Sequence, residues 1–166
     1  MTADTLTLYE PAPMLPALAF TVYGQAKPGG SKRAFLNPKT QQIVVIEDSK
    51  NKPWRAEVVA AAAYAMDNCG IADPLLGPLA VELRFYRPRP KGHYGSGRNS
   101  GVIKASAPAY PTTRPDVLKL ARLVEDAMAH VVYADDAQIV DEHLLKLWGS
   151  PERCEVHVRC LEPCNP

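Results

Sequence analysis

Residues 114–147 read RPDVLKLARLVEDAMAHVVYADDAQIVDEHLLKL, and they contain the clearest structural pattern in the chain. Apolar residues recur in its first half at helical spacing, which predicts an amphipathic helix. The stripe consists of Val117, Leu120, Ala121, Val124 and Met128. Pro115 fits the first helical position. Residues 138–147 then read as a strand, so this stretch predicts a helix, a turn and a strand in succession.

Acidic residues flank the predicted helix. Asp116 falls in its first turn, and Asp135 and Asp136 follow its end. Carboxylate oxygens are the ligands that hard cations such as Mg²⁺ take, so convergence of the two groups would make a metal site. Taken alone, Asp116 also fits a charge that favours the helix dipole, and Asp135-Asp136 also fits a turn. Successive strand residues point to opposite faces, so we expect only one of this pair to face the helix.

The rest of the chain predicts a small sheet and a second helix. With 166 residues and 46% hydrophobic composition, it suits one globular domain. The predicted elements are strands at residues 17–23, 78–86 and 153–161, a hairpin of residues 33–36 and 42–46, and a helix at residues 53–68 that ends before Gly70. We expect one domain over residues 17–161, a flexible segment at residues 1–16, and a tail at residues 162–166.

Charge is spread unevenly along the chain. The net charge is +1 overall, but +5 over residues 24–55, +8 over residues 84–122 and −6 over residues 123–166. Residues 87–113 have no periodicity and read as a long basic loop. This pattern indicates a surface for a polyanion beside a metal-binding one, although ordinary solvated loops explain the charge equally well.

Four cysteines, of which Cys154 and Cys160 flank His157, raise the possibility of structural zinc. These two cysteines fall on one face of a predicted strand, roughly 20 Å apart at ~3.3 Å per residue, so they cannot bind one ion. Free thiols are therefore expected. The first residues do not resemble a signal peptide, and no segment suits a membrane span, so the expected location is cytoplasmic.

The chain resembles the RusA family of Holliday junction resolvases (crossover junction endodeoxyribonucleases) in residues 114–117, 133–138 and Lys146. The resemblance is strongest over residues 112–148 and extends more weakly to the first strand, the basic loop at residues 24–33 and the helix after Pro53. It implies a small α/β (α+β) fold with a mixed sheet and two main helices, in an intertwined homodimer. It also implies a nuclease of DNA recombination and repair, which binds four-way junctions and nicks two strands symmetrically with Mg²⁺ or Mn²⁺.

The resemblance also assigns roles to residues. The family's catalytic aspartates match Asp116 and Asp136, its functional lysine matches Arg122, and its second aspartate is replaced by Leu118. Arginine can hold a phosphate but stays charged, so Arg122 would act electrostatically, together with Lys119 and Lys146. The residues that could complete the metal coordination are Glu125, Asp126 and Asp135, or else water. The residues expected to contact the DNA backbone are Lys27, Lys32, Arg33, Arg87, Arg89, Lys91 and Arg114.

Two other functions remain open at this point. A junction-binding protein without cleavage activity would keep the basic segments and tolerate Leu118. A metal-dependent nuclease that acts on other branched nucleic acids would use the same carboxylates without two-fold symmetry.

Overall fold

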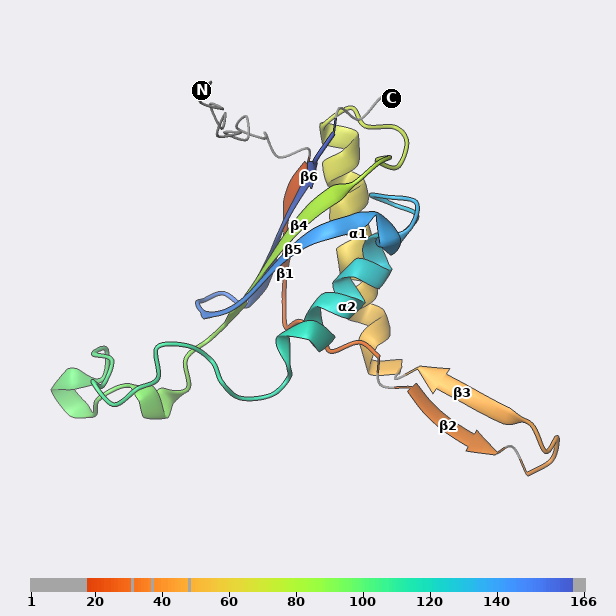
Figure 1. The fold of residues 1–166 in the computed structure, drawn as a ribbon. Helices are drawn as coiled ribbons and strands as arrows, with labels where there is room; N and C mark the ends of the chain where they lie inside the picture. The colour runs from red at the N-terminus through yellow and green to blue at the C-terminus, as the bar shows by residue number, and fades with distance from the viewer. Residues whose placement is uncertain (1–17, 31, 37, 48, 163–166) are drawn as a thin grey trace, which may run out of the picture.

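The structure is a computed structural model that describes residues 18–30, 32–36, 38–47 and 49–162 (Figure 1). The segment expected at residues 1–16 lies outside the described residues, as does all but the first residue of the tail expected at residues 162–166. The described strands are β1 (Leu18–Tyr23), β2 (Lys32–Leu36), β3 (Ile43–Glu47), β4 (Leu79–Arg87), β5 (Ile139–Trp148) and β6 (Arg153–Cys160). The helices are α1 (Lys52–Asn68) and α2 (Val117–Met128), with short 3-10 turns at Ser49–Asn51, Lys91–His93, Gly97–Asn99 and Asp136–Gln138.

The main sheet is mixed and has four strands in the order β1-β6-β4-β5. β6 is antiparallel to both β1 and β4, whereas β5 is parallel to β4. β5 therefore forms one edge of the sheet, with no strand of the described chain on its outer side. A parallel neighbour requires a crossover connection, and α2 provides it between β4 and β5.

Both helices cover the same face of this sheet (Figure 1). The core forms where their apolar stripes meet alternate residues of the strands, because strand side chains point to opposite faces. Its fully buried members include Leu83 and Phe85 on β4, Leu123 on α2 and Val156 on β6. These elements confirm the α+β fold expected from the sequence.

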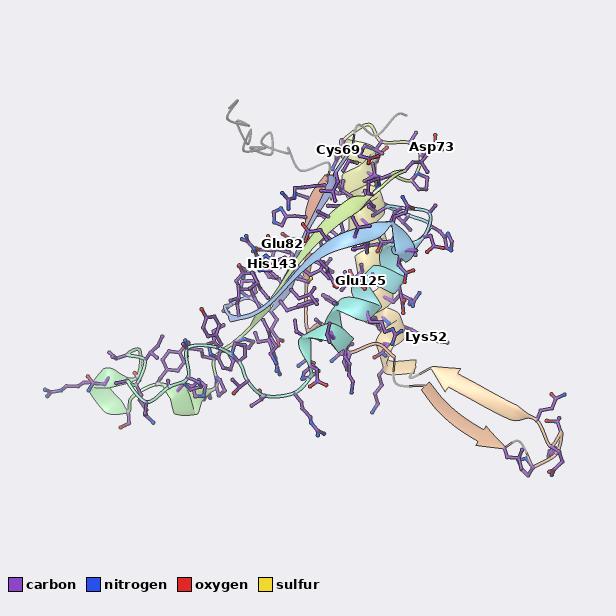
Figure 2. The ribbon with its side chains drawn as sticks, viewed as in Figure 1. Lys52, Cys69, Asp73, Glu82, Glu125 and His143 are labelled. Atoms are coloured by element: carbon purple, nitrogen blue, oxygen red, sulfur yellow. The ribbon has the colours of Figure 1, made fainter. Side chains whose placement is uncertain are left out.

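The opposite face of the sheet carries polar side chains. Glu82 on β4 lies beside His143 on β5, with 3.3 Å between Oε2 and Nδ1 (Figure 2). Arg84 also forms an ion pair with Glu82. Burial raises the pKa of Glu82, but the hydrogen bonds with His143 and Arg84 outweigh it and lower that pKa overall. This face is therefore stabilised by ion pairs and hydrogen bonds.

Most predicted boundaries agree with the structure within two residues, and the start of α2 shows a physical reason for one difference. The helix begins at Val117, so Asp116 is its N-cap and Pro115 precedes the helix. Asp116 has extended backbone angles, with φ −69° and ψ 145°. The prediction that Pro115 occupies the first helical position was wrong by two residues.

The predicted hairpin is confirmed and projects from the body of the molecule as an arm (Figure 1). Its strands pair antiparallel from Lys32 opposite Glu47 to Leu36 opposite Ile43. The long loop at residues 87–113 contains more structure than its sequence indicated. Its backbone is organised around Trp148 of β5, whose Nε1 donates to the carbonyl oxygen of Pro108 at 3.1 Å.

The cysteines differ in part from the expectation of free thiols. Cys69 and Cys154 are free, and burial raises the pKa of the Cys154 thiol strongly. Cys160 forms a disulfide, so for this residue the prediction was wrong. Within the described residues, neither helix is long and apolar enough to cross a membrane.

Candidate active site

The N-terminus of α2 presents Asp116 to solvent. Its side chain is 63% exposed and makes no capping hydrogen bond. Its Oδ2 atom lies 3.6 Å from Nζ of Lys119, one helical turn further on. Leu118, which replaces the family's second aspartate, is 68% exposed. Two sequence-predicted residues, Asp116 and Lys119, therefore form an exposed ion pair beside an exposed leucine.

Lys146 lies at the same end of α2. Its Nζ donates hydrogen bonds to the carbonyl oxygens of Thr113 and Pro115, at 2.8 and 3.0 Å. Both acceptors belong to the segment that enters the helix directly before Asp116. Lys146 therefore holds the backbone that carries Asp116, whereas the sequence had predicted contact with the substrate for its side chain.

The loop after β1 packs against the first turns of α2 through glycine. The amide of Gly29 donates to the carbonyl oxygen of Lys119 at 2.6 Å. A Cβ atom on Gly29 would lie 2.9 Å from the backbone nitrogen of Leu123, so only glycine allows this approach. Buried Asn51 fixes the same loop, because its Nδ2 donates to the carbonyl oxygen of Pro28 at 2.9 Å. These contacts hold Lys27 close to the start of α2.

The turn before β5 separates the roles of the two adjacent aspartates. Asp135 caps the 3-10 turn, because its Oδ1 accepts a hydrogen bond from the amide of Ala137 at 2.8 Å. Gln138 completes a capping box by accepting from the amide of Asp135 at 3.1 Å. The side chain of Gln138 also donates to the carbonyl oxygen of Leu75 at 2.9 Å. Both aspartates are exposed, and Asp135 is the one whose side chain caps the turn.

An acidic cluster forms beside the C-terminal half of α2, and we define it as Glu125 and Asp126 on α2, Asp136 in the 3-10 turn and Glu142 on β5. Burial, a side-chain hydrogen bond with Glu142 and the negative charges of the other members raise the pKa of Glu125 to about 8. Its Oε1 atom is shielded from solvent and has no hydrogen-bond partner in the described part of the chain. Figure 2 shows Glu125 on α2 beside β5. A proton or a cation is therefore needed to offset the repulsion in this cluster.

Two neighbours stabilise the cluster's position. Tyr133 is fully buried, and its hydroxyl donates to the carbonyl oxygen of Glu125 at 3.0 Å, which holds the last turns of α2. Burial and the nearby carboxylates raise the pKa of this phenol. Asp126 lies 3.7 Å from Arg55 of α1, so part of its charge is already neutralised.

Glu142 is the member that the sequence did not single out. Its register partner on β4 is Val81, which is buried in the core. Glu142 therefore falls on the face of β5 that points toward the helices. An acidic residue at an inward-facing strand position was the signal that could have identified it.

The structure places Asp116 and Asp136 at opposite ends of α2. Glu125 lies nine positions after Asp116, which is ~13 Å along the helix axis. Asp136 lies near Glu125, whereas Lys146, the eighth residue of β5, contacts the segment before Asp116. Two ligands of one Mg²⁺ ion must each lie ~2.1 Å from it. Within one chain, Asp116 and Asp136 are therefore too far apart to bind the same ion. Among the described residues, no group of three or more histidine, cysteine or acidic side chains is arranged to hold a metal ion.

The predicted DNA-contacting residues are spread over three regions: Lys27, Arg87 and Arg114 lie beside Asp116, and the others lie in the long loop and in the arm. Arg87 donates from Nη1 to the carbonyl oxygen of Arg114 at 2.9 Å, which joins the two ends of the long basic loop. Arg89 donates to the carbonyl oxygen of Pro108 at 3.0 Å, and its guanidinium lies 5.4 Å from the centre of the Trp148 ring. Lys91 is exposed in the same loop. Lys32 and Arg33 are the first two residues of β2, in the projecting arm. Arg122 is exposed on α2 and contacts the glycine loop near Gly30.

Comparison with known proteins identifies the family. The family model described as endodeoxyribonuclease RusA matches residues 25–159, which include α2, the long basic loop and strands β4, β5 and most of β6, but not β1. A protein of Bacillus subtilis (strain 168), described as the uncharacterised protein YqaN, is 30% identical over 142 residues, which are 86% of this chain and 95% of that protein. The family expected from residues 112–148 is thus confirmed, and this chain belongs to the RusA family of endodeoxyribonucleases.

Proposed function

We propose that this protein is a Mg²⁺-dependent endonuclease that resolves four-way DNA junctions as a homodimer. The observation that carries the proposal is the site at the start of α2. There an exposed carboxylate, Asp116, lies among the basic residues Lys27, Lys119 and Arg114 within a RusA-family chain. A carboxylate repels the phosphates of DNA, so Asp116 does not contribute to DNA affinity and its presence among basic residues indicates another role. Metal-assisted cleavage of a phosphodiester is such a role.

The donor set fits Mg²⁺ in its chemistry. Asp116, Asp136, Glu125 and Glu142 offer only oxygen ligands, and Mg²⁺ is commonly bound by one or two carboxylates, with water and phosphate oxygens as its other ligands. The pKa of Glu125 is raised in part because neighbouring carboxylates repel its negative charge, and a bound cation would reduce that repulsion. Bound Mg²⁺, or Mn²⁺ in its place, would supply polarisation of the phosphate and a lowered pKa for water.

The protein's own residues position the DNA strand. Lys119 and Arg122 lie one turn apart on α2, where their charges can stabilise the phosphate during cleavage. Lys146 acts on Asp116 indirectly, through the carbonyl oxygens of Thr113 and Pro115. Arg87, Arg89 and Lys91 provide contacts to the DNA backbone that carry no sequence information.

A second copy of the chain would complete the site. Because Asp116 and Asp136 lie at opposite ends of α2, both act on one cation only if they come from different chains. In a two-fold dimer, contacts are reciprocal, so the Asp116 end of each chain would face the acidic cluster of the other and form two equal sites. Two sites match the two strands that must be cut in a four-way junction. Asp135 and Asp126 would then support the site, through the turn and the ion pair with Arg55.

One observation favours a second candidate, a junction-binding protein without cleavage activity. Leu118 is exposed where the family has its second aspartate, so the Asp116 end offers one carboxylate fewer. The two candidates differ in one assay, in which a labelled four-way junction is incubated with the protein with and without Mg²⁺. We expect paired symmetric nicks with the metal and binding alone without it. Binding without nicks at any Mg²⁺ or Mn²⁺ concentration would support the second candidate.

A further inference from the structure

A cavity of about 550 Å³ opens beside Asp116. Three segments form its walls, namely the loop at Gln25–Pro28, the end of β4 at Phe85–Arg87 and the start of α2 at Arg114–Leu120. The glycine contact between Gly29 and Lys119 fixes the first wall to the third. The amide of Gly24 also donates to the carbonyl oxygen of Glu152 at 2.9 Å, which ties the loop to the sheet. The cavity is therefore bounded by segments that are held to one another.

The polar part of the lining favours an anion. Lys27, Arg87, Arg114 and Lys119 outnumber the acids Asp116 and Glu152. Lys27 is half-buried, and its Nζ donates to the side-chain oxygen of Gln25, so its charge is held at the wall. A phosphate at the mouth would meet these basic groups next to Asp116.

The apolar part of the lining requires more than a phosphate. Pro28, Pro115 and Leu120 contribute apolar surface on two sides. Phe85 and Tyr86, at the end of β4, line a third side. An apolar lining beyond a cationic mouth suits an organic group joined to a phosphate.

We infer that this cavity receives one deoxynucleotide of the cleaved strand, with its phosphate at the cationic mouth and its base inside. The inference rests on the proposed function and adds contact with a single base to the backbone contacts described above. Pockets of ~300–1,000 Å³ enclose small organic molecules, so the volume suits a nucleotide and excludes a duplex. A base must leave the stack to enter, which costs least where pairing is already strained, as at the crossover of a junction.

The test places 2-aminopurine, which brightens when it leaves the base stack, at each position around the crossover of a four-way junction. Metal-free buffer allows binding without cleavage. On binding, we expect about threefold brighter emission at one position per cleaved strand, with no change in a matched linear duplex. Gln25→Trp, which fills the cavity, should abolish the increase, whereas Tyr64→Trp on the exposed side of α1 should keep it.

A second measurement uses the unaltered protein and does not depend on a variant that folds. Each of the four deoxynucleoside 5′-monophosphates is titrated and compared with 2-deoxyribose 5-phosphate, which lacks the base. At least one nucleotide should bind about tenfold more tightly than the sugar phosphate and shift the NMR signals of Ala26 and Leu120. Equal binding of all five, or junction binding without brightening at any position, would overturn the inference and leave the nuclease proposal intact. A protein that does not distinguish the junction from duplex DNA would instead refute the proposed function.

Discussion

Glu125→Gln tests whether repulsion among the carboxylates of the acidic cluster lowers the free energy of unfolding at high pH. The pKa of Glu125 rises from 4.5 to about 8 on folding, because of burial and the neighbouring carboxylates. A folded-state pKa above the unfolded value means that the stabilisation is complete below pH 4.5 and is lost as the pH rises through 8. A shift of this size corresponds to an upper limit of about 5 kcal/mol. Since the cluster lies near the surface, we expect roughly half of that limit after solvent screening.

The assay is thermal unfolding between pH 4 and 9 in metal-free buffer. The wild-type midpoint should fall relative to Glu125→Gln by roughly 5–10 °C across this range, since glutamine carries no charge to repel Glu142. Glu57→Gln, an exposed position on α1, serves as the matched control and should keep the wild-type slope. At pH 8, added Mg²⁺ should recover part of the wild-type loss and have less effect on Glu125→Gln. Parallel pH profiles for wild type and Glu125→Gln would show that Glu125 is not the group whose ionisation destabilises the fold.

Three further predictions concern the support of the site. Gly29→Ala should destabilise the fold by ~1–3 kcal/mol in urea unfolding, because the new Cβ would lie 2.9 Å from the Leu123 nitrogen. Gly92→Ala is the control and should leave the stability unchanged, because no atom lies within 4 Å of its added Cβ. Gln138→Ala should lower the free energy of unfolding by ~1–3 kcal/mol, since it removes the capping box and leaves the Leu75 carbonyl without this donor. A change smaller than the error of the urea unfolding measurement would contradict this prediction. Arg89→Ala should lower the slope of log affinity for junction DNA against log salt by about one, and an unchanged slope would remove Arg89 from the DNA surface.

The periodic segments were predictable because their local pattern matches their environment. Residues 117–128 have an apolar stripe that faces the core, and β4 alternates as a strand with one face buried. The hairpin of residues 33–36 and 42–46 was also predicted. In each of these segments, neighbours along the chain determine the structure, so the sequence contains the information directly.

The arrangement of the site depended on contacts between distant segments. The motifs at Asp116 and Asp136 are close in sequence, but β5 returns along α2 and places Lys146, rather than Asp136, beside the segment before Asp116. Glu142 joined Glu125 only through the parallel pairing of β4 and β5. Trp148 organised a loop that has no periodicity of its own. Spacing along the chain indicates which residues share an element, but not the direction in which the next element runs.

The most direct test of the proposed shared site mixes two inactive variants. Asp116→Asn and Asp136→Asn are each purified, combined in equal amounts, unfolded and refolded together so that chains exchange. If each site takes Asp116 from one chain and Asp136 from the other, every mixed dimer has one intact site. We expect recovery of about one quarter of the wild-type nicking, as single nicks, when half of the dimers are mixed. No recovery above the separate variants, in a sample shown to contain mixed dimers, would contradict the shared site.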